Sequence, residues 1–440
     1  MRGSWAALVY AKESGDDGAM TATHRLRDLL RDPVYLRIWL VGGFSGIARW
    51  LEMLVFGVFA FELTGSPFLV ALLIILRMMP LVVFGSLVGT LADRLPPRLL
   101  LLTGLLVATL VSAMLVLLFI LDVARYWHVA FATLATGMAW TIDMTIRRRI
   151  LGDTAGQDRI ALAMSFDSAT NNATRMLGPL LGGFIYQWLG ASGAFALSTC
   201  LYALCVALLL AVPATVSTAA RGRGATKVLG DLLEAFAFAA RDRDVSRILL
   251  VTVVFNIWGF PFVSMIPVIG GDELALSAGW IGVLAALEGG GAFLGALAIA
   301  VSVRRMNFRG LYYFGTLAYL LLVFTAGWMA EAPAMAAVLF CVGLAGACFT
   351  TMQSTLIYSA APPEMRGRMF GMMVLCIGTG LIGFANIGLM GEWFGGTAAI
   401  RIVAAEGLIP LLLLGFGWRQ LWRRADARGR PSAETGPRRP

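Results

Sequence analysis

Six stretches of this sequence run for more than twenty residues without a charged side chain. A helix crosses the ~30 Å hydrocarbon core of a bilayer with about 20 consecutive apolar residues, so each stretch is long enough to span a membrane. Backbone polar groups find no water there, and a helix satisfies them within one segment. The sequence therefore predicts spanning helices in Leu99–Leu121, Ile248–Gly271, Gly310–Ala330, Ala332–Pro363 and Met369–Gly391. The sixth stretch, Met176–Ala220, suits the end of one span and all of the next.

The composition agrees with a membrane protein and argues against a soluble protein, a nucleic-acid-binding protein and a metalloprotein. Of 440 residues, 59% are hydrophobic and 14% are charged, whereas soluble chains carry about 25% charged residues. The net charge of +9 does not indicate nucleic acid binding, because the basic residues lie in short loops at regular intervals. The five cysteines lie inside apolar segments and there are two histidines, so we expect no metal site and no cofactor.

Apolar patterning extends the prediction to an all-α membrane protein with twelve transmembrane helices. Several segments contain charged residues but keep enough apolar length to cross the bilayer, which acts as the solvent for this chain. The predicted spans are 37–62, 68–92, 99–121, 127–146, 161–187, 193–212, 247–270, 278–302, 310–330, 334–359, 369–391 and 397–419.

The distribution of Lys and Arg tests this map, because cytoplasmic loops of membrane proteins are enriched in both. With the N-terminus in the cytoplasm, nearly all of the 35 Lys and Arg residues fall in the termini and in loops that lead from an even span to an odd one. The loops on the other side contain a single basic residue, Arg125. We therefore expect a multi-pass protein of the inner (plasma) membrane with both termini in the cytoplasm.

The longest internal hydrophilic segment divides the chain into two halves of six spans each. Within this segment, residues 228–240 carry apolar side chains at helical spacing, which predicts an amphipathic helix on the membrane surface. The expected organisation is a cytoplasmic segment at 1–36, a first half at 37–212, a linker at 213–246, a second half at 247–420 and a basic tail at 421–440.

A short sequence with glycine and charged residues follows the second predicted span. Gly89 removes side-chain bulk near the end of that helix, and Asp93 is placed to oppose the positive N-terminus of a neighbouring helix. With Arg94 and Arg98, these residues resemble the loop signature G-x-x-x-D-R-x-x-x-R/K of major facilitator transporters. The resemblance implies a latch against the eleventh span in the outward-facing state, and the alternative is a solvated turn. The corresponding loop 303–308 lacks the aspartate.

The fifth predicted span contains Gly178, Pro179, Gly182 and Gly183. The proline permits a bend, and the glycines allow another helix to approach closely; the eighth span, small on one side, is the expected partner. The sequence resembles the core of the antiporter motif of exporting major facilitator transporters, although Thr174 replaces its usual first glycine. The resemblance implies export, and the alternative is a kinked packing helix without bearing on direction.

Two turn sequences narrow the resemblance further. Glu62–Pro67 contains an L-T-G-S turn, and Pro363–Arg368 is similar to P-x-x-x-R-G-R. Both resemble the drug and siderophore exporter branch of the superfamily, which includes enterobactin and macrolide exporters. The resemblance covers roughly residues 33–420 and is silent on which molecule is moved. After the fourth span that branch often reads P-A-R, where this chain has Thr145–Arg147, so we expect a less sharp helix end.

Ionisable side chains inside spans are costly in lipid and usually face a cavity or pair with one another. Glu288 lies alone in the middle of the eighth span and is the first candidate for a proton-coupling carboxylate, followed by Glu52 and Asp167. The alternative is that Glu288 pairs across the two halves with an arginine such as Arg175 and is purely structural.

Further charges inside the spans are candidates for the cavity wall. Arg49 and Glu52 lie three residues apart on one helix face, which predicts that they pair. Asp143 lies one turn before Arg147, which favours a role as a cytoplasmic gate over a role in carrying protons. The cavity candidates in this group are Arg49, Arg77, Asp143 and Arg175.

The apolar interior and the uncharged polar side chains indicate which kind of molecule the protein transports. The 20 methionines suit an amphiphilic molecule. We therefore expect a monomeric transporter, not an enzyme, that exports a drug-like or siderophore-like amphiphile by proton antiport. Symport, facilitation and, more remotely, a membrane-embedded enzyme remain as alternatives, although no H-E-x-x-H or G-x-S-x-G sequence is present. The substrate-path candidates are Asn171, Asn172, Asn256, Gln353 and Asn386.

Overall fold

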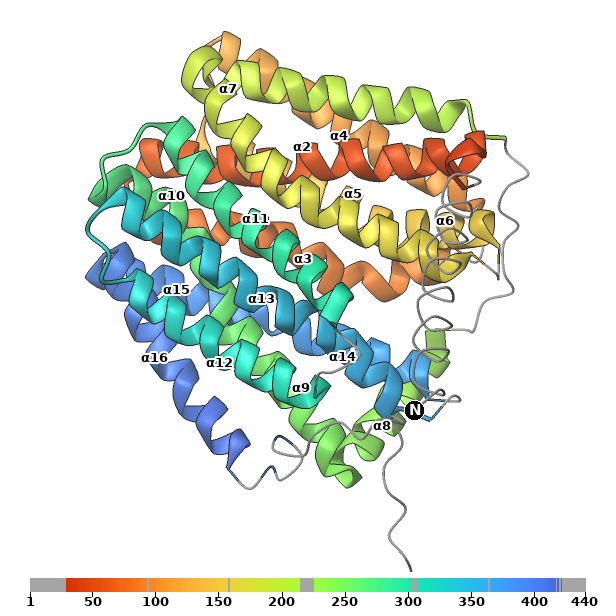
Figure 1. Ribbon diagram of the computed structural model, residues 1–440. Helices are drawn as coiled ribbons and strands as arrows, with labels where there is room; N and C mark the ends of the chain where they lie inside the picture. Colours follow the sequence, from red (N-terminus) through yellow and green to blue (C-terminus); the bar gives the residue numbers. More distant parts are fainter. Residues whose placement is uncertain are drawn as a thin grey trace, which may run out of the picture.

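The computed structural model describes residues 29–92, 95–156, 159–213, 225–302, 307–362, 365–416, 418 and 421. In these residues the molecule is a bundle of long helices, most of which run between the same two ends (Figure 1). We call the end that carries residue 29, the helix of the linker and residue 421 the terminal face. The other end, with the short turns that follow the odd-numbered spans, is called the opposite face.

The first half contains six spans. Asp32 caps the first helix, since its side chain accepts from the backbone N–H groups of Val34 and Tyr35. The fourth span, predicted to end at residue 146, continues through a π-helical segment as far as Ala155. The less sharp end agrees with the expectation, but the predicted boundary is about nine residues too early. The helices are α2 (Pro33–Thr64), α3 (Pro67–Ala92), α4 (Pro97–Ile120), α5 (Tyr126–Ile142), the π-helical Asp143–Arg147, α6 (Arg148–Ala155) and α7 (Ile160–Leu210).

The helix α7 comprises two spans joined by a sharp turn. Gly190 has φ 66° and ψ −171°, a conformation that glycine adopts without a Cβ penalty. Figure 1 shows α7 folding back on itself at its upper left end. Eleven described helices are long and apolar enough to cross a membrane. One of the eleven is α7, which contains two spans, so the described helices provide twelve spans. The prediction of twelve spanning helices in two six-helix halves is therefore confirmed for the described part of the chain.

The second half repeats the six-span plan with more irregular helices. Its first span changes from α-helix to π- and 3-10-helix around Pro261 and Pro267, and the eleventh span is interrupted at Thr379. The elements are α9 (Arg243–Val254), Phe255–Gly259, Phe260–Met265, α10 (Ile266–Val268), Ile269–Glu273, α11 (Ala278–Ser302), α12 (Phe308–Ala326), α13 (Ala332–Ala360), α14 (Arg366–Gly378), α15 (Gly380–Phe394) and α16 (Gly396–Gly415).

The linker helix α8 (Ala225–Arg241) lies at the terminal face and includes the segment 228–240 that the sequence singled out. It buries Ala235 and leaves Leu233 and Phe236 exposed. Glu234 of α8 forms an ion pair of 2.6 Å with Arg368 at the start of α14. The exposed apolar stripe fits an interfacial position, which stays a prediction.

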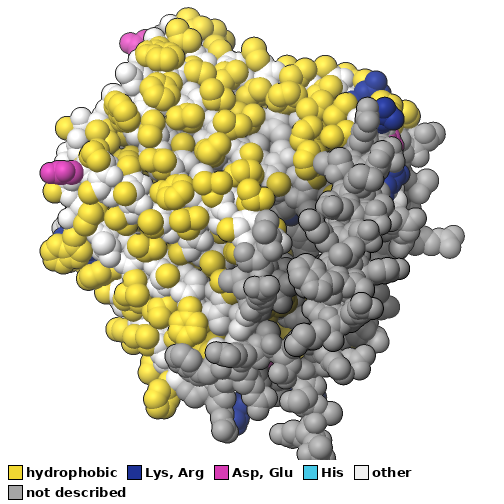
Figure 2. All heavy atoms as spheres, in the orientation of Figure 1, with side chains coloured by type: hydrophobic (Ala, Val, Ile, Leu, Met, Phe, Trp, Pro, Cys, Tyr) yellow, Lys and Arg dark blue, Asp and Glu magenta, His cyan; other side chains and the backbone are white. Residues whose placement is uncertain are grey.

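The outer surface of the bundle is apolar. Figure 2 shows hydrophobic side chains across most of the visible face, with charged ones confined to its edges. Leu110, Ile382 and Leu413 are more than 60% exposed although they lie within spans. Contiguous apolar surface of this extent is unstable in water and matches a hydrocarbon environment.

Candidate functional site

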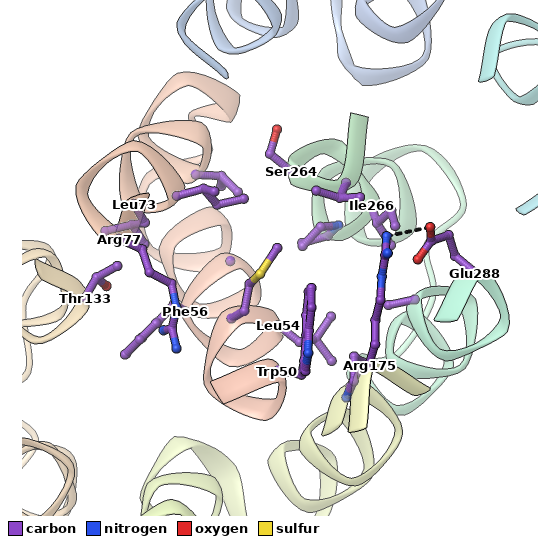
Figure 3. A pocket seen from close by; sticks show the side chains of 18 residues that line it. Trp50, Leu54, Phe56, Leu73, Arg77, Thr133, Arg175, Ser264, Ile266 and Glu288 are labelled. Carbon is purple, nitrogen blue, oxygen red and sulfur yellow. Dashed lines mark hydrogen bonds and ion pairs between the residues drawn. The ribbon is translucent and has the colours of Figure 1, made fainter. Parts of the chain in front are cut away.

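A cavity lies between the two halves, with about 670 Å³ of space that no protein atom fills, open solvent included. Its walls come from α2, α3, α5 and α7 of the first half and from Phe260–Met265, α10 and α11 of the second (Figure 3). Most lining side chains are apolar, and Pro179 of the glycine-rich motif is among them. The charged and hydroxyl side chains that line it are Arg77, Arg175, Glu288, Thr133 and Ser264.

Arg175 and Glu288 form an ion pair on one wall of this cavity and join the halves. The Nη2 atom of Arg175 on α7 lies 2.6 Å from Oε1 of Glu288 on α11, and Glu288 is 3% exposed. The guanidinium of Arg175 also lies over the rings of Trp50 and Phe260, 5.4 and 5.7 Å from their centroids. Figure 3 shows Arg77 on the other side of the cavity, with Trp50 and Leu54 between the two arginines.

Glu52 is completely buried beside the cavity and has partners from three helices. It accepts hydrogen bonds from Ser112 Oγ at 2.8 Å and Tyr202 OH at 3.2 Å, and Arg77 Nη1 lies 3.7 Å away. The predicted pair between Arg49 and Glu52 is wrong. Three residues along a helix leave room for the two side chains to diverge, and each finds a better partner on another helix.

Arg49 turns away from Glu52 toward the terminal face. Its Nη2 donates to Asn171 Oδ1 at 2.9 Å, and its Nη1 lies 3.9 Å from Asp143 Oδ2. Asn171 therefore accepts a hydrogen bond from an arginine of the first half, and it does not line the central cavity.

A second group of buried charges lies nearer the terminal face, around Arg147. Its Nε is 2.9 Å from Asp143 Oδ1, one helical turn earlier, and its Nη1 is 2.6 Å from Asp167 Oδ1. Arg148 also pairs with Asp167, at 3.2 Å. Asp167 is thus engaged by two arginines away from the central cavity.

Sequence reasoning missed that Arg147 is buried, because it placed this residue in a cytoplasmic loop. Arg147 is 3% exposed. Gly42 on α2 makes room for its guanidinium, which lies where a Cβ at position 42 would be. The two signals in the sequence were the missing proline after the fourth span and the Gly42–Gly43 pair on the first.

A smaller cavity inside the first half is lined by Arg49, Arg77, Trp140, Asp143 and Tyr202, among others. Three of its buried polar atoms have no hydrogen-bond partner in the described structure, namely Arg77 Nη2, Trp140 Nε1 and Asp143 Oδ2. Buried polar groups without a protein partner are usually satisfied by ordered water. This cavity is therefore suited to hold water between the central cavity and the cluster around Arg147.

The glycine-rich motif of the fifth span lies between two helices. A Cβ on Gly178 would stand 2.9 Å from the carbonyl oxygen of Ile47, and one on Gly182 would stand 3.1 Å from that of Leu51. A Cβ on Gly183 would stand 2.9 Å from Gly282 Cα. The motif thus brings α7 against α2 on one side and against the small side of α11 on the other, which confirms the expected packing partner.

The remaining uncharged candidates do not line the central cavity either. Asn256 donates to the carbonyl of Thr252 at 2.8 Å, and Gln353 donates to Oγ1 of Thr252 at 3.2 Å. Asn386 donates to Glu406 at 2.9 Å, and Asn172 lies half-buried on α7. Gln353 and Asn386 thus join neighbouring helices, as amides in lipid often do, whereas Asn256 bonds to its own backbone one turn earlier.

The predicted latch is only partly within the described residues. Asp93 and Arg94 lie outside them, and Gly89 lies in the last turns of α3. Arg98 donates from Nε and Nη2 to the carbonyl oxygens of Leu209 and Leu210, at 3.2 and 2.9 Å. It therefore caps the end of α7, and the latch itself stays a prediction. Among described residues no three His, Cys, Asp or Glu side chains gather as metal ligands.

Comparison with known proteins adds to this geometry. The family model described as Major Facilitator Superfamily matches residues 38–385. YfiS of Bacillus subtilis (strain 168), described as an uncharacterized MFS-type transporter, is 24% identical over 391 residues, which are 84% of this chain and 90% of that protein.

Solved structures of transporters share the fold. A POT family transporter in complex with 5-aminolevulinic acid has a TM-score of 0.72 at 10% identity and covers 88% of this chain and 96% of its own. A mutant of the nucleoside transporter NupG has a TM-score of 0.69 at 14% identity, over 89% and 100%. A bacterial homolog of the human lysosomal transporter Spinster, inward-facing and unoccupied, has a TM-score of 0.64 at 14% identity, over 88% and 95%.

Proposed function

Because this chain belongs to the Major Facilitator Superfamily and is a membrane transporter of that type, we propose that it exports an amphiphilic small molecule in exchange for protons. It works as a monomer in the inner (plasma) membrane, with the terminal face in the cytoplasm. The two halves rock about the central cavity and expose it to each side in turn, which is the motion that parallel repeats support. The cargo is a drug-like or siderophore-like amphiphile.

The observation that carries this proposal is the pair Arg175–Glu288. It is a buried ion pair on the cavity wall, and its two members belong to different halves. A carboxylate there is placed to sense both the contents of the cavity and the relative position of the halves. The other proton-coupling candidates, Glu52 and Asp167, have their partners within the first half and do not line the cavity.

The exchange follows from what a proton does to this pair. When Glu288 binds a proton from the outside, its charge disappears and the attraction to Arg175 falls to that of a neutral hydrogen bond. The contact between α7 and α11 is then weaker, and the cavity changes its polarity. Cargo leaves to the outside, and loss of the proton to the cytoplasm restores the ion pair.

Uptake of labelled amphiphiles into inverted vesicles tests the proposal, because uptake there corresponds to export from the cell. With an acidic interior, uptake is expected to rise and to return to its basal rate when an uncoupler is added. Equilibration that ignores the gradient would indicate facilitation and would exclude proton antiport.

The role of Glu288 is tested by Glu288→Gln, with Glu331→Gln in an exposed turn as the matched control. The first variant is expected to lose stimulation by the pH gradient while the control keeps it. Stimulation that survives Glu288→Gln would make the Arg175–Glu288 pair purely structural and would return the coupling role to Glu52 or Asp167.

Uptake by proton symport is the second candidate, and one feature favours it. Arg77 and Arg175 both line the cavity, so a protonated Glu288 leaves Arg175 free to bind an anionic group of the cargo. A proton and an anion would then occupy the cavity together and move in the same direction. Stimulated uptake into right-side-out vesicles with an acidic exterior would support this candidate over export.

A further inference from the structure

At the opposite face, each half places an acceptor side chain on the first turn of a helix that belongs to the other half. Glu392, near the end of α15, accepts at Oε2 from Ser66 Oγ at 2.6 Å and from the backbone N–H of Phe68 at 3.3 Å. These donors begin α3 in the first half. The carboxylate therefore satisfies part of the N-terminus of a helix from the other half.

The second contact runs in the reverse direction. Gln187, near the end of the first arm of α7, accepts at Oε1 from Ser277 Oγ at 2.9 Å and from the backbone N–H of Gly279 at 3.0 Å. These donors begin α11 in the second half. The first half thus caps a helix of the second half, and the second half caps a helix of the first.

The two contacts have the same construction. In each, a serine directly precedes the first helical residue, and the backbone donor lies two residues after that serine. In each, the acceptor follows by four residues a glycine that packs on the same helix. A Cβ on Gly388 would stand 3.2 Å from Phe68 Cα, and one on Gly183 would stand 2.9 Å from Gly282 Cα.

The correspondence extends to the order of the spans. The capped helices α3 and α11 are the second spans of their halves, and the acceptors lie on the fifth spans. A repeated contact is expected where two halves share one plan. The acceptors differ in charge, because Glu392 is a carboxylate and Gln187 is a neutral amide.

We propose that Glu392 and Gln187 are positioning residues of the transport cycle, a pair of latches that hold the two halves together at the opposite face. This inference rests on the alternating access proposed above. When the halves separate at that face, both caps break, because each joins the two halves. Glu392 and Gln187 are exposed, so water replaces the lost partner and the latches open at little cost.

A third acceptor at the same face provides the matched control. Glu273 accepts at Oε1 from the backbone N–H of Thr397 at 2.7 Å, at the start of α16. Both residues belong to the second half, so this cap does not report on the distance between the halves. Replacement of Glu273 by alanine therefore removes a comparable helix cap and leaves both proposed latches intact.

The experiment measures the distance between the halves at the opposite face. Spin labels are attached through Val123→Cys in the first half and Glu331→Cys in the second, in a full-length protein from which the five native cysteines have been removed. Both positions lie in turns of that face and are exposed. Pulsed electron paramagnetic resonance in detergent then gives the ratio of the separated to the closed population.

Loss of one exposed cap is expected to change this ratio about two- to fivefold, so Glu392→Ala with Gln187→Ala should raise it roughly four- to twenty-five-fold. Glu273→Ala should leave it within about twofold, and Glu392→Gln, which keeps an acceptor, should change it less than Glu392→Ala. An unchanged ratio in the double variant, or an equal shift in Glu273→Ala, would overturn the proposal.

The two single variants, Glu392→Ala and Gln187→Ala, give the same test with half the perturbation if the double variant is not recovered. The readout needs neither cargo nor a proton gradient. Failure of proton-driven uptake would therefore count against the proposed function only. The distances between the two spin labels would still test the proposed latches.

Discussion

The two halves share one helical plan but differ in what they bury. The described part of the first half buries six charged side chains, whereas the described part of the second buries a single one, Glu288. The second half instead contains a neutral network. Tyr312 OH lies 2.8 Å from Thr252 Oγ1, and Gln353 donates to the same hydroxyl. The buried charges of the first half are Arg49, Glu52, Arg77, Asp143, Arg147 and Asp167.

This difference teaches that the charges are not needed for the fold. Two halves of the same architecture are assembled with and without them, and buried ion pairs often stabilise a protein no better than apolar residues of the same volume. Charges inside a membrane are functional by default. We therefore expect electrostatics to constrain motion mainly in the first half, which contacts the second half at the cavity through Arg175–Glu288.

The largest effect is expected from Arg147→Met, which leaves Asp143 and Asp167 without their shared partner. Breaking a buried pair from one side costs about 3–5 kcal/mol, because a charge stays buried without compensation. Arg148 still contacts Asp167, so the upper end of that range is not expected. The thermal unfolding midpoint in detergent measures the loss.

A second variant separates the missing charge from the missing volume. Arg147→Met combined with Asp167→Asn should recover part of the midpoint lost in Arg147→Met, because one of the two unpaired charges is gone. If Arg147→Met melts like the parent protein, the cluster is hydrated in solution and does not constrain the first half.

A smaller loss is expected from Glu52→Gln. The amide keeps an acceptor for Ser112 or Tyr202 but removes the negative charge beside Arg77, whose Nη1 lies 3.7 Å from Glu52. Hydrogen bonds and contacts to a buried charge are worth about 1.5–3 kcal/mol, so the midpoint should fall less than in Arg147→Met. A larger fall than in Arg147→Met would show that the charges nearest the central cavity dominate the first half.

The fold was predictable because it depends on long apolar segments and on the alternation of basic loops, both of which are local in the sequence. The partners of the buried charges were not. For Asp143 and Arg147 the sequence indicated only that they lie one helical turn apart, and the structure shows that they pair. Glu52 was paired wrongly, because its partners Ser112 and Tyr202 are set by how α4 and α7 pack on α2.

The same limit applies to the sites between the halves. Glu288 was identified from its isolation in an apolar span, and Arg175 was named as one possible partner. Spacing along the chain does not decide between a free and a paired carboxylate, because the partner lies on a helix of the other half. The caps at Ser66 and Ser277 were not found at all. Both acceptors lie on another span, 326 positions from Ser66 and 90 positions from Ser277. The L-T-G-S turn by itself indicates only how a helix begins.

The smallest effect is expected in the second half, from Gln353→Leu. This change removes one neutral hydrogen bond, from Nε2 to Thr252 Oγ1, and that hydroxyl keeps Tyr312 as a partner. A net loss of about 1 kcal/mol or less is expected, visible as a small shift of the thermal midpoint. Gln353→Glu places a charge in the same neutral network and should cost more than Gln353→Leu, since no arginine is seen to contact Gln353 among the described residues. If both variants melt alike, the second half tolerates charge as the first does, and the contrast between the halves loses its physical basis.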